Sequence, residues 1–298
     1  MKKILLLGGS GFIGRHVVAA LVRAGHSITV PTRRLAHAKH LLTWPQVTVR
    51  ELHVTDPATL QEVMRGHDVV IHLIAVLHGN ESSFEQMHVQ LPLSVAQACV
   101  QAGVPHLIHM SALGADPQGP SMYQRSKGRG ELALHEIASA HGLRLTVLRP
   151  SVVFGEDDRF INLFARMQRV VPLVPLAGAG ARFQPVWVQD VAQAVRQTIE
   201  QPQAQGLKYE LGGPEVKTLA ELVRHAGRWA GCPRPVLPLP HAVAWVQALL
   251  MECAPGEPLM SRDNLASMQR DNVLSGSCPG LLELGLGRGQ SLGAVFRV

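Results

Sequence analysis

The sequence contains few cysteines and few aromatic residues. Only four cysteines occur among 298 residues, and none of them forms a CxxC pair. A disulfide framework and a zinc site are therefore not predicted, and a reducing cytoplasm is the expected compartment. The 15 histidines are scattered without an HExxH spacing, so no metal site is predicted. The net charge is +6, but the basic residues are dispersed and aromatic residues make up only 4%, which argues against nucleic-acid binding.

Long apolar runs are also absent. Hydrophobic residues account for 46% of the chain, yet every apolar segment is interrupted before the roughly 20 residues that a membrane span needs. The first apolar run is cut by glycines at position 8, so we expect a strand there rather than a signal peptide. The chain is predicted to be soluble and without a transmembrane segment. The apolar stretch 241–251 leaves a peripheral membrane contact open, although such segments more often pack on their own domain.

Short apolar runs alternate with helix-compatible stretches through the first half of the chain. This alternation is typical of a parallel sheet covered by helices on both faces. The predicted strands are 3–7, 27–32, 47–52, 68–74, 106–110 and 144–148, and the predicted helices are 16–24, 58–64, 91–102 and 128–141. The predicted fold class is therefore α/β, a doubly wound parallel sheet of the Rossmann type with a smaller C-terminal lobe.

The composition changes after residue 150, where proline and glycine become more frequent. We expect a Rossmann domain over 1–150, with 186–202 packing back on it, and a smaller lobe formed by 151–185 and 203–298. A helical pattern begins again at Asp190. A second one runs over 218–229, where Thr218 and Glu221 have the spacing of a capping box.

A glycine-rich turn lies directly between the first predicted strand and the first predicted helix. Residues 8–14 read GGSGFIG. Gly8 and Gly11 allow a tight turn and the close approach of a pyrophosphate, while Gly14 allows the helix to pack against the strand. The helix N-terminus offers free N–H groups and a partial positive charge to the phosphates. The turn therefore predicts dinucleotide binding.

The end of the second predicted strand favours one nucleotide over the other. NAD-binding proteins usually place an acidic residue about 20 positions beyond the glycines, but here Thr32 is followed by Arg33 and Arg34, and no acid occurs before Glu51. A carboxylate would repel a 2′-phosphate, whereas a guanidinium binds it through a planar fork. The predicted cofactor is NADP(H), and NAD(H) stays possible.

Two further motifs follow the glycine turn in order, YQRSK at 123–127 and RPSVVFG at 149–155, and RFQPVWVQDVA occupies 182–192. With these motifs the chain resembles the extended and atypical short-chain dehydrogenase/reductase superfamily. More narrowly, it resembles the group around the Rossmann-fold accessory subunit of respiratory complex I, over about residues 1–215.

The resemblance implies an NADP(H)-binding protein and a set of contacts. It also implies that the position of an adenine-contacting aspartate is taken by His53, with Asp56 three residues later, so that the backbone of Val54 could serve instead. The nucleotide contacts predicted from the turn, the arginines and the resemblance are Gly8, Ser10, Gly11, Phe12, Ile13, Gly14, Thr32, Arg33, Arg34, His53, Val54, Leu73, Ile74, Ala75, Tyr123, Lys127, Pro150, Val152 and Val153.

In catalytic members of this superfamily a tyrosine exchanges a proton with the substrate oxygen, and a lysine four positions later lowers the pKa of that tyrosine. Tyr123 and Lys127 match this pattern, and the spacing of four places them on one helix face. The resemblance also implies a carbonyl-polarising hydroxyl. Its position falls at Ala112, with Ser111 one residue earlier, and alanine cannot donate a hydrogen bond. The predicted catalytic residues are Tyr123, Lys127 and Ser111.

Two hypotheses follow. The first is a complex I accessory-subunit type of protein, in which the nucleotide is partly or wholly structural and which has a respiratory-complex or quinone-related protein partner. The second is an NAD(P)H-dependent reductase, epimerase or dehydratase that acts on a small or quinone-like substrate. Both predict a cytoplasmic protein, and the first leaves room for a location peripheral to the inner membrane.

Overall fold

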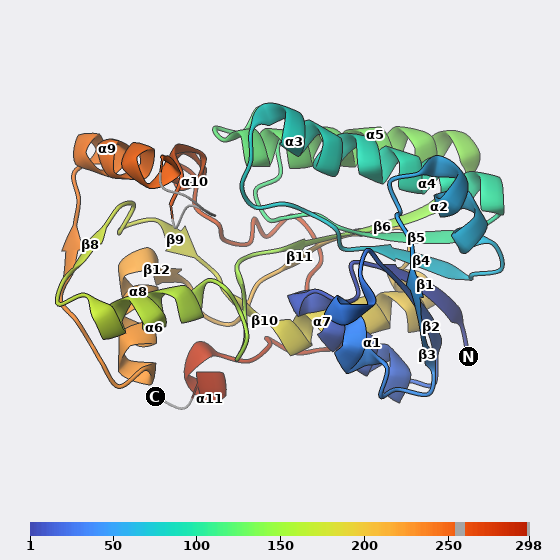
Figure 1. The fold of residues 1–298 in the computed structure, drawn as a ribbon, viewed down its shortest axis with the longest axis horizontal. Helices are drawn as coiled ribbons and strands as arrows, with labels where there is room; N and C mark the ends of the chain where they lie inside the picture. The colour runs from blue at the N-terminus through green and yellow to red at the C-terminus, as the bar shows by residue number, and fades with distance from the viewer. Residues whose placement is uncertain (254–259, 297–298) are drawn as a thin grey trace.

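Seven parallel strands form the central sheet of the computed structural model, which describes residues 1–253 and 260–296 (Figure 1). Their spatial order is β11-β6-β5-β4-β1-β2-β3. The strands are β1 (Lys3–Leu7), β2 (Ser27–Thr32), β3 (Val47–Glu51), β4 (Val69–His72), β5 (His106–Met110), β6 (Arg144–Pro150) and β11 (Lys208–Leu211). All six predicted strands are present, and the α/β Rossmann-type fold class is confirmed. The seventh strand, β11, was not predicted.

Helices cover both faces of this sheet because β1 points alternate side chains to opposite sides. Ile4 and Leu6 pack on one face against α1 (Phe12–Arg23) and α7 (Val188–Glu200). Leu5 and Leu7 pack on the other. That second face is covered by α2 (Pro57–Met64), α4 (Leu91–Ala102) and α5 (Met122–His141). Shorter helical turns are η1 (Leu35–Leu41), α3 (Glu81–Glu85), the π-helical η2 (Gln86–Gln90) and η3 (Pro202–Ala204).

Helix α5 begins six residues earlier than the sequence predicts. Ser121 accepts a hydrogen bond from the backbone of Gln124 at 3.1 Å, and the Gln124 side chain returns to the backbone of Ser121 at 3.4 Å. This capping box starts the helix at Met122. The glycines at 128 and 130 conceal the helical pattern in the sequence because glycine is a poor helix former.

The smaller lobe is built around α6 (Ile161–Val170) and α8 (Leu219–Trp229), which pack against each other. The capping box predicted for α8 is confirmed, since Glu221 accepts from the backbone N–H of Thr218 at 2.7 Å and donates its own N–H to the Thr218 hydroxyl at 3.3 Å. The remaining elements of the chain are β7 (Val153–Phe154), β8 (Val174–Leu176), β9 (Arg182–Phe183), β10 (Val186–Trp187), β12 (Lys217–Thr218), β13 (Val236–Pro238), α9 (His241–Glu252), α10 (Arg262–Ser267) and α11 (Leu292–Phe296).

Segments from the second half of the chain return to the central sheet. Helix α7 packs along α1, and β11 pairs with β6 although it lies within the range 203–298. The division into a Rossmann domain and a smaller lobe at the stated boundaries stays a prediction. Within residues 1–253 and 260–296, no helix is long and apolar enough to cross a membrane.

Candidate functional site

The glycine turn joins β1 to α1 at the carboxyl edge of the sheet. Gly8 has φ +87°, and a Cβ there would lie 3.3 Å from the backbone of Leu73 and Ile74, so the end of β4 runs directly beside the turn. A Cβ on Gly14 would fall 2.6 Å from the Cα of Gly9. This confirms the packing role of Gly14, because any larger residue would push α1 off β1.

Gly11, unlike Gly8 and Gly14, has room for a side chain. A Cβ on Gly11 would approach only the carbonyl oxygen of Gly8, at 3.4 Å. Gly11 is also the N-cap of α1, and within the described part of the chain no side chain caps this helix and no acid lies in its first turn. The first N–H groups of α1 thus face open space with a partial positive charge, an arrangement that suits a phosphate.

The segment after β6 reaches the same helix end. A Cβ on Gly155 would lie 3.3 Å from the ring of Phe12, and the Arg15 guanidinium forms an ion pair with Asp157 at 2.8 Å. Pro150 is buried at the end of β6, and Val152 and Val153 are half-buried beyond it. The Arg15–Asp157 pair was not predicted, because the two residues lie far apart in the chain.

The end of β2 presents its two arginines to solvent. Arg33 and Arg34 are exposed, while Thr32 is buried and its hydroxyl donates to the Arg34 carbonyl at 3.0 Å. Glu51 pairs with Thr32 across the sheet, and its carboxylate accepts the N–H of Leu35 at 2.8 Å. The Glu51 carboxylate therefore lies at the backbone that follows the two arginines, a neighbour that the sequence spacing did not reveal.

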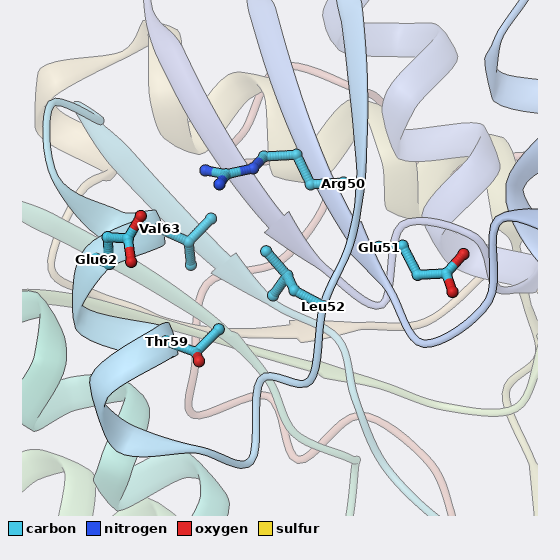
Figure 2. A pocket seen from close by; sticks show the side chains of 6 residues that line it. All are labelled: Arg50, Glu51, Leu52, Thr59, Glu62 and Val63. Carbon is cyan, nitrogen blue, oxygen red and sulfur yellow. The ribbon is translucent and has the colours of Figure 1, made fainter.

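The predicted adenine end lies beyond β3. His53 is exposed and Val54 is half-buried, while the Asp56 carboxylate caps α2 by accepting the N–H of Thr59 at 2.8 Å. A hollow of about 270 Å³ lies nearby, between β3 and α2. Figure 2 shows the Arg50 side chain extending toward α2, whereas Glu51 turns to the other side of the strand. The residues that line the hollow are Arg50, Glu51, Leu52, Thr59, Glu62 and Val63. Among the described residues, therefore, no predicted nucleotide contact lines it.

The side chains of Lys127 and Ser111 lie at the carboxyl end of β5. The ammonium of Lys127 is buried and donates to the Met110 carbonyl at 3.3 Å. Burial lowers the pKa of Lys127 to about 8, and Glu131 opposes that shift. The Ser111 hydroxyl is buried without a hydrogen-bond partner in the described part of the chain, and Ala112 follows it. An unpartnered hydroxyl in the interior is costly unless a ligand satisfies it.

Tyr123 does not have the lowered pKa that the sequence predicts. Burial raises the pKa of its phenol to about 12. The cause is desolvation, which disfavours the charged phenolate. The catalytic roles of Tyr123, Lys127 and Ser111 stay predictions.

Three buried histidines, His72, His88 and His109, lie near Lys127, and no sequence motif predicted them. The rings of His72 and His109 are stacked, with their Nδ1 atoms 3.1 Å apart. His88 accepts the N–H of Val76 at Nε2 (3.2 Å), so its proton is on Nδ1, which donates to the Ser126 hydroxyl at 2.9 Å. Burial first, and then the Lys127 charge, lowers the pKa of His88 to about 3. A neutral His88 thus ties the loop after β4 to α5.

The smaller lobe holds the start of α5. The Asp263 carboxylate, from α10, accepts the N–H groups of Met122 at 2.6 Å and of Tyr123 at 3.1 Å. A second contact joins Arg270 to Asp116 at 2.5 Å. These contacts fix the helix end that carries Tyr123, and they connect residues more than 100 positions apart.

The predicted site residues thus gather along one edge of the sheet. The glycine turn, the end of β4 and the segment after β6 lie side by side. The Lys127 side chain reaches the carboxyl end of β5. His53 is exposed at the outer strand. The described residues contain no group of three or more His, Cys, Asp or Glu side chains that could hold a metal ion.

Comparison with known proteins identifies the family of this chain. The model of the NAD dependent epimerase/dehydratase family matches residues 4–212. The mouse protein NADH dehydrogenase (ubiquinone) 1 alpha subcomplex subunit 9, mitochondrial, is 31% identical over 289 residues, which cover 94% of this chain and 75% of that protein. The sterol-4-alpha-carboxylate 3-dehydrogenase, decarboxylating, of Dictyostelium discoideum is 23% identical over 297 residues, with coverages of 89% and 90%.

Among solved structures, DesIV, a dTDP-glucose 4,6-dehydratase from Streptomyces venezuelae with NAD and TYD bound, has the same fold. Its TM-score is 0.79 at 21% identity, over 99% of this chain and 95% of that one. The parallel sheet, the glycine turn and the match over most of the chain lead to one conclusion: the chain belongs to the NAD dependent epimerase/dehydratase family.

Proposed function

We propose that this chain is an NADP(H)-binding protein of the respiratory accessory-subunit type, in which the nucleotide serves mainly as a structural ligand. One contrast carries the proposal. The turn and helix end that suit a pyrophosphate are complete, whereas Ala112 stands where a carbonyl-polarising hydroxyl is expected and the pKa of Tyr123 is raised to about 12. A site that binds the nucleotide but does not catalyse a reaction explains both observations.

Residues of this chain fit the nucleotide. Gly11 leaves room in front of the α1 N-terminus, and the amides there would hold the pyrophosphate. Leu73 and Ile74 would flank the adenosine, and the Lys127 ammonium would reach the nicotinamide ribose. When bound, the nicotinamide supplies hydride chemistry in catalytic members of the family. In this chain we assign the nucleotide the role of filling and stabilising the carboxyl edge of the sheet.

A respiratory partner is proposed from the relatives. The mouse relative at 31% identity is named as a subunit of an NADH dehydrogenase, and we propose that this chain associates with a comparable NADH:quinone oxidoreductase. The described cysteines, Cys99, Cys232, Cys253 and Cys278, are all free, which is consistent with a reducing compartment. The proposed location is therefore cytoplasmic and peripheral to the inner membrane.

Within this proposal, NADPH binds more tightly than NADH. Charge-assisted bonds to a phosphate contribute about 1.5 to 3 kcal/mol each, and the Glu51 carboxylate is already engaged by the Leu35 N–H. Isothermal titration calorimetry of the Arg33→Ala/Arg34→Ala variant should show a loss of the preference by at least about tenfold. Arg65→Ala, an exposed arginine after α2, is the matched control and should keep the preference. Equal affinity of the unmodified protein for NADH and NADPH would contradict the phosphate-site assignment.

A second candidate function is catalysis on a small or quinone-like carbonyl substrate. Tyr123 and Lys127 favour it, as does the dehydrogenase relative at 23% identity. We expect Tyr123→Phe to leave the NADPH affinity within about twofold, because the hydroxyl faces the substrate side, and we expect the unmodified protein to leave the nicotinamide absorbance unchanged with a panel of carbonyls and quinones. Steady NADPH oxidation that falls by roughly two to four decades in Tyr123→Phe would establish the catalytic alternative.

A further inference from the structure

Helix α9 is apolar on nearly all sides and is only partly covered. It contains no Asp, Glu, Lys or Arg between positions 241 and 251. Ala244 and Ala248 are buried against the lobe. Val243, Val246 and Leu250 are 50%, 50% and 67% exposed, and their spacing of three and four places them on one stripe. A helix that is apolar all round is normally covered by protein or lipid.

Two other segments of the smaller lobe also carry exposed apolar side chains. Val170, at the end of α6, is 84% exposed, and Leu173, before β8, is 42% exposed. Leu237 of β13 is 49% exposed and pairs with Pro175 of β8. The Gln247 side chain of α9 donates to the Pro175 carbonyl at 3.3 Å, which joins the helix to these strands.

We call this surface the distal apolar face. Figure 1 shows α9, β8 and α6 along the end of the smaller lobe that lies farthest from the central sheet. The face consists of Val170, Leu173, Leu237, Val243, Val246 and Leu250.

Three exposed arginines lie in the segments that form the distal apolar face, and Glu252, which ends α9, is paired with Arg262 at 2.8 Å. The sequence has no Asp or Glu between 159 and 189, and none between 222 and 251. The exposed Arg166 and Arg169 stand in α6 just before Val170. Exposed Arg234 precedes β13 and is held to α6 by its bond to the Gln168 carbonyl at 3.1 Å. The segments that carry the exposed apolar side chains therefore also carry exposed arginines.

We propose that the distal apolar face docks on the surface of an anionic lipid bilayer, with its apolar side chains in the interface and its arginines on lipid phosphates. Charge complementarity selects this occupant, because Arg166, Arg169 and Arg234 are exposed, whereas Glu252 at the end of α9 is already paired with Arg262 at 2.8 Å. A second copy of the same face would bring these arginines against one another. Trp245, also exposed, carries the Arg262 guanidinium 5.4 Å above its ring, and tryptophan favours the membrane interface.

The test is co-sedimentation of the full chain with vesicles of phosphatidylcholine alone or with about a third of phosphatidylglycerol. We expect binding to the anionic vesicles that exceeds binding to neutral ones by at least about tenfold and that is lost in about 1 M salt, where the Debye length falls to about 3 Å. The Val246→Gln/Leu250→Gln variant and the Arg166→Gln/Arg169→Gln variant should each lower binding to the anionic vesicles by at least about tenfold. Neither variant touches the nucleotide site, so this test is independent of the proposed function.

Matched controls keep the proposal falsifiable. Leu132, on α5, is 54% exposed, and Leu132→Gln should bind vesicles as the unmodified chain does. Arg23→Gln/Arg65→Gln removes the same charge elsewhere and should also leave binding unchanged. Equal binding to neutral and anionic vesicles, or an equal loss in a control, would overturn the proposal. So would a dimer in solution that Val246→Gln/Leu250→Gln dissociates, because a second copy would then be the occupant.

Discussion

Gly11→Val is expected to abolish NADPH binding and to leave the fold intact. Gly11 has φ −79°, which valine can adopt, and a Cβ there meets only the Gly8 carbonyl at 3.4 Å. The branched side chain would instead fill the space in front of the α1 N-terminus, where the pyrophosphate is proposed to lie. Calorimetry should show an NADPH affinity lowered by at least about a hundredfold, with an unchanged circular dichroism spectrum.

Substitutions at two other glycines serve as comparisons for Gly11→Val. Gly180→Val is the matched control, because Gly180 is exposed and a Cβ there meets nothing within 4 Å; it should bind NADPH normally. Gly14→Ala should instead destabilise the fold, since its Cβ would collide with the backbone of Gly9. A folded Gly11→Val protein that binds NADPH with normal affinity would show that the phosphates bind elsewhere.

Lys127→Met is expected to make the nucleotide-free protein more stable and to make it bind NADPH less well. The native pKa of Lys127 is about 8 against an ordinary 10.5, and burial is the main cause. Below about pH 8 the lysine is charged in both states, and its burial costs roughly 3 kcal/mol. Between about pH 8 and 10.5 the unfolded chain holds more protons than the native state, so Lys127 makes stability rise with pH across this window.

The variant should therefore gain roughly 1 to 3 kcal/mol of unfolding free energy near pH 7, after about 1 kcal/mol is subtracted for the lost bond to Met110. The rise in stability between about pH 8 and 10.5 should shrink by the full contribution of the shifted pKa, roughly 3 kcal/mol. NADPH affinity should fall by at least about tenfold, because the ammonium is proposed to bind the ribose.

Urea unfolding at about pH 8 and about pH 10.5 measures the changes in stability. Calorimetry with NADPH measures the change in affinity. Lys39→Met, at an exposed lysine of η1, is the control and should change neither quantity. A Lys127→Met protein with unchanged NADPH affinity would separate this lysine from the nucleotide site. A less stable variant would show that burial of the charge is not the dominant cost.

The sequence predicted the elements whose signal is local. The strands of the first half are short apolar runs bounded by turns, and the structure has all of them. The capping box of Thr218 and Glu221 is equally local, because its members are three residues apart. Strand β11 was missed because Lys208–Leu211 mixes polar and apolar residues, and only pairing with β6 makes it a strand. Such pairing between distant segments leaves no mark on either segment alone.

The same distinction holds for the site. The glycine turn and the spacing of Tyr123 and Lys127 are readable because each motif is contiguous. The raised pKa of Tyr123 depends on burial, which the fold decides. Glu51 comes beside the arginines through sheet register, and Asp263 reaches the start of α5 from the smaller lobe. None of these neighbours could be predicted without the tertiary structure.

The nucleotide that the protein carries distinguishes a structural from a catalytic role of the cofactor. The full chain is purified without added cofactor, denatured, and the released nucleotide is identified and quantified by mass spectrometry before and after incubation with carbonyl and quinone substrates. We expect NADP(H), close to one molecule per chain, in an oxidation state that the incubation does not change. Release of NAD(H), or of no nucleotide, would contradict the assigned cofactor, and a change of oxidation state would contradict its structural role.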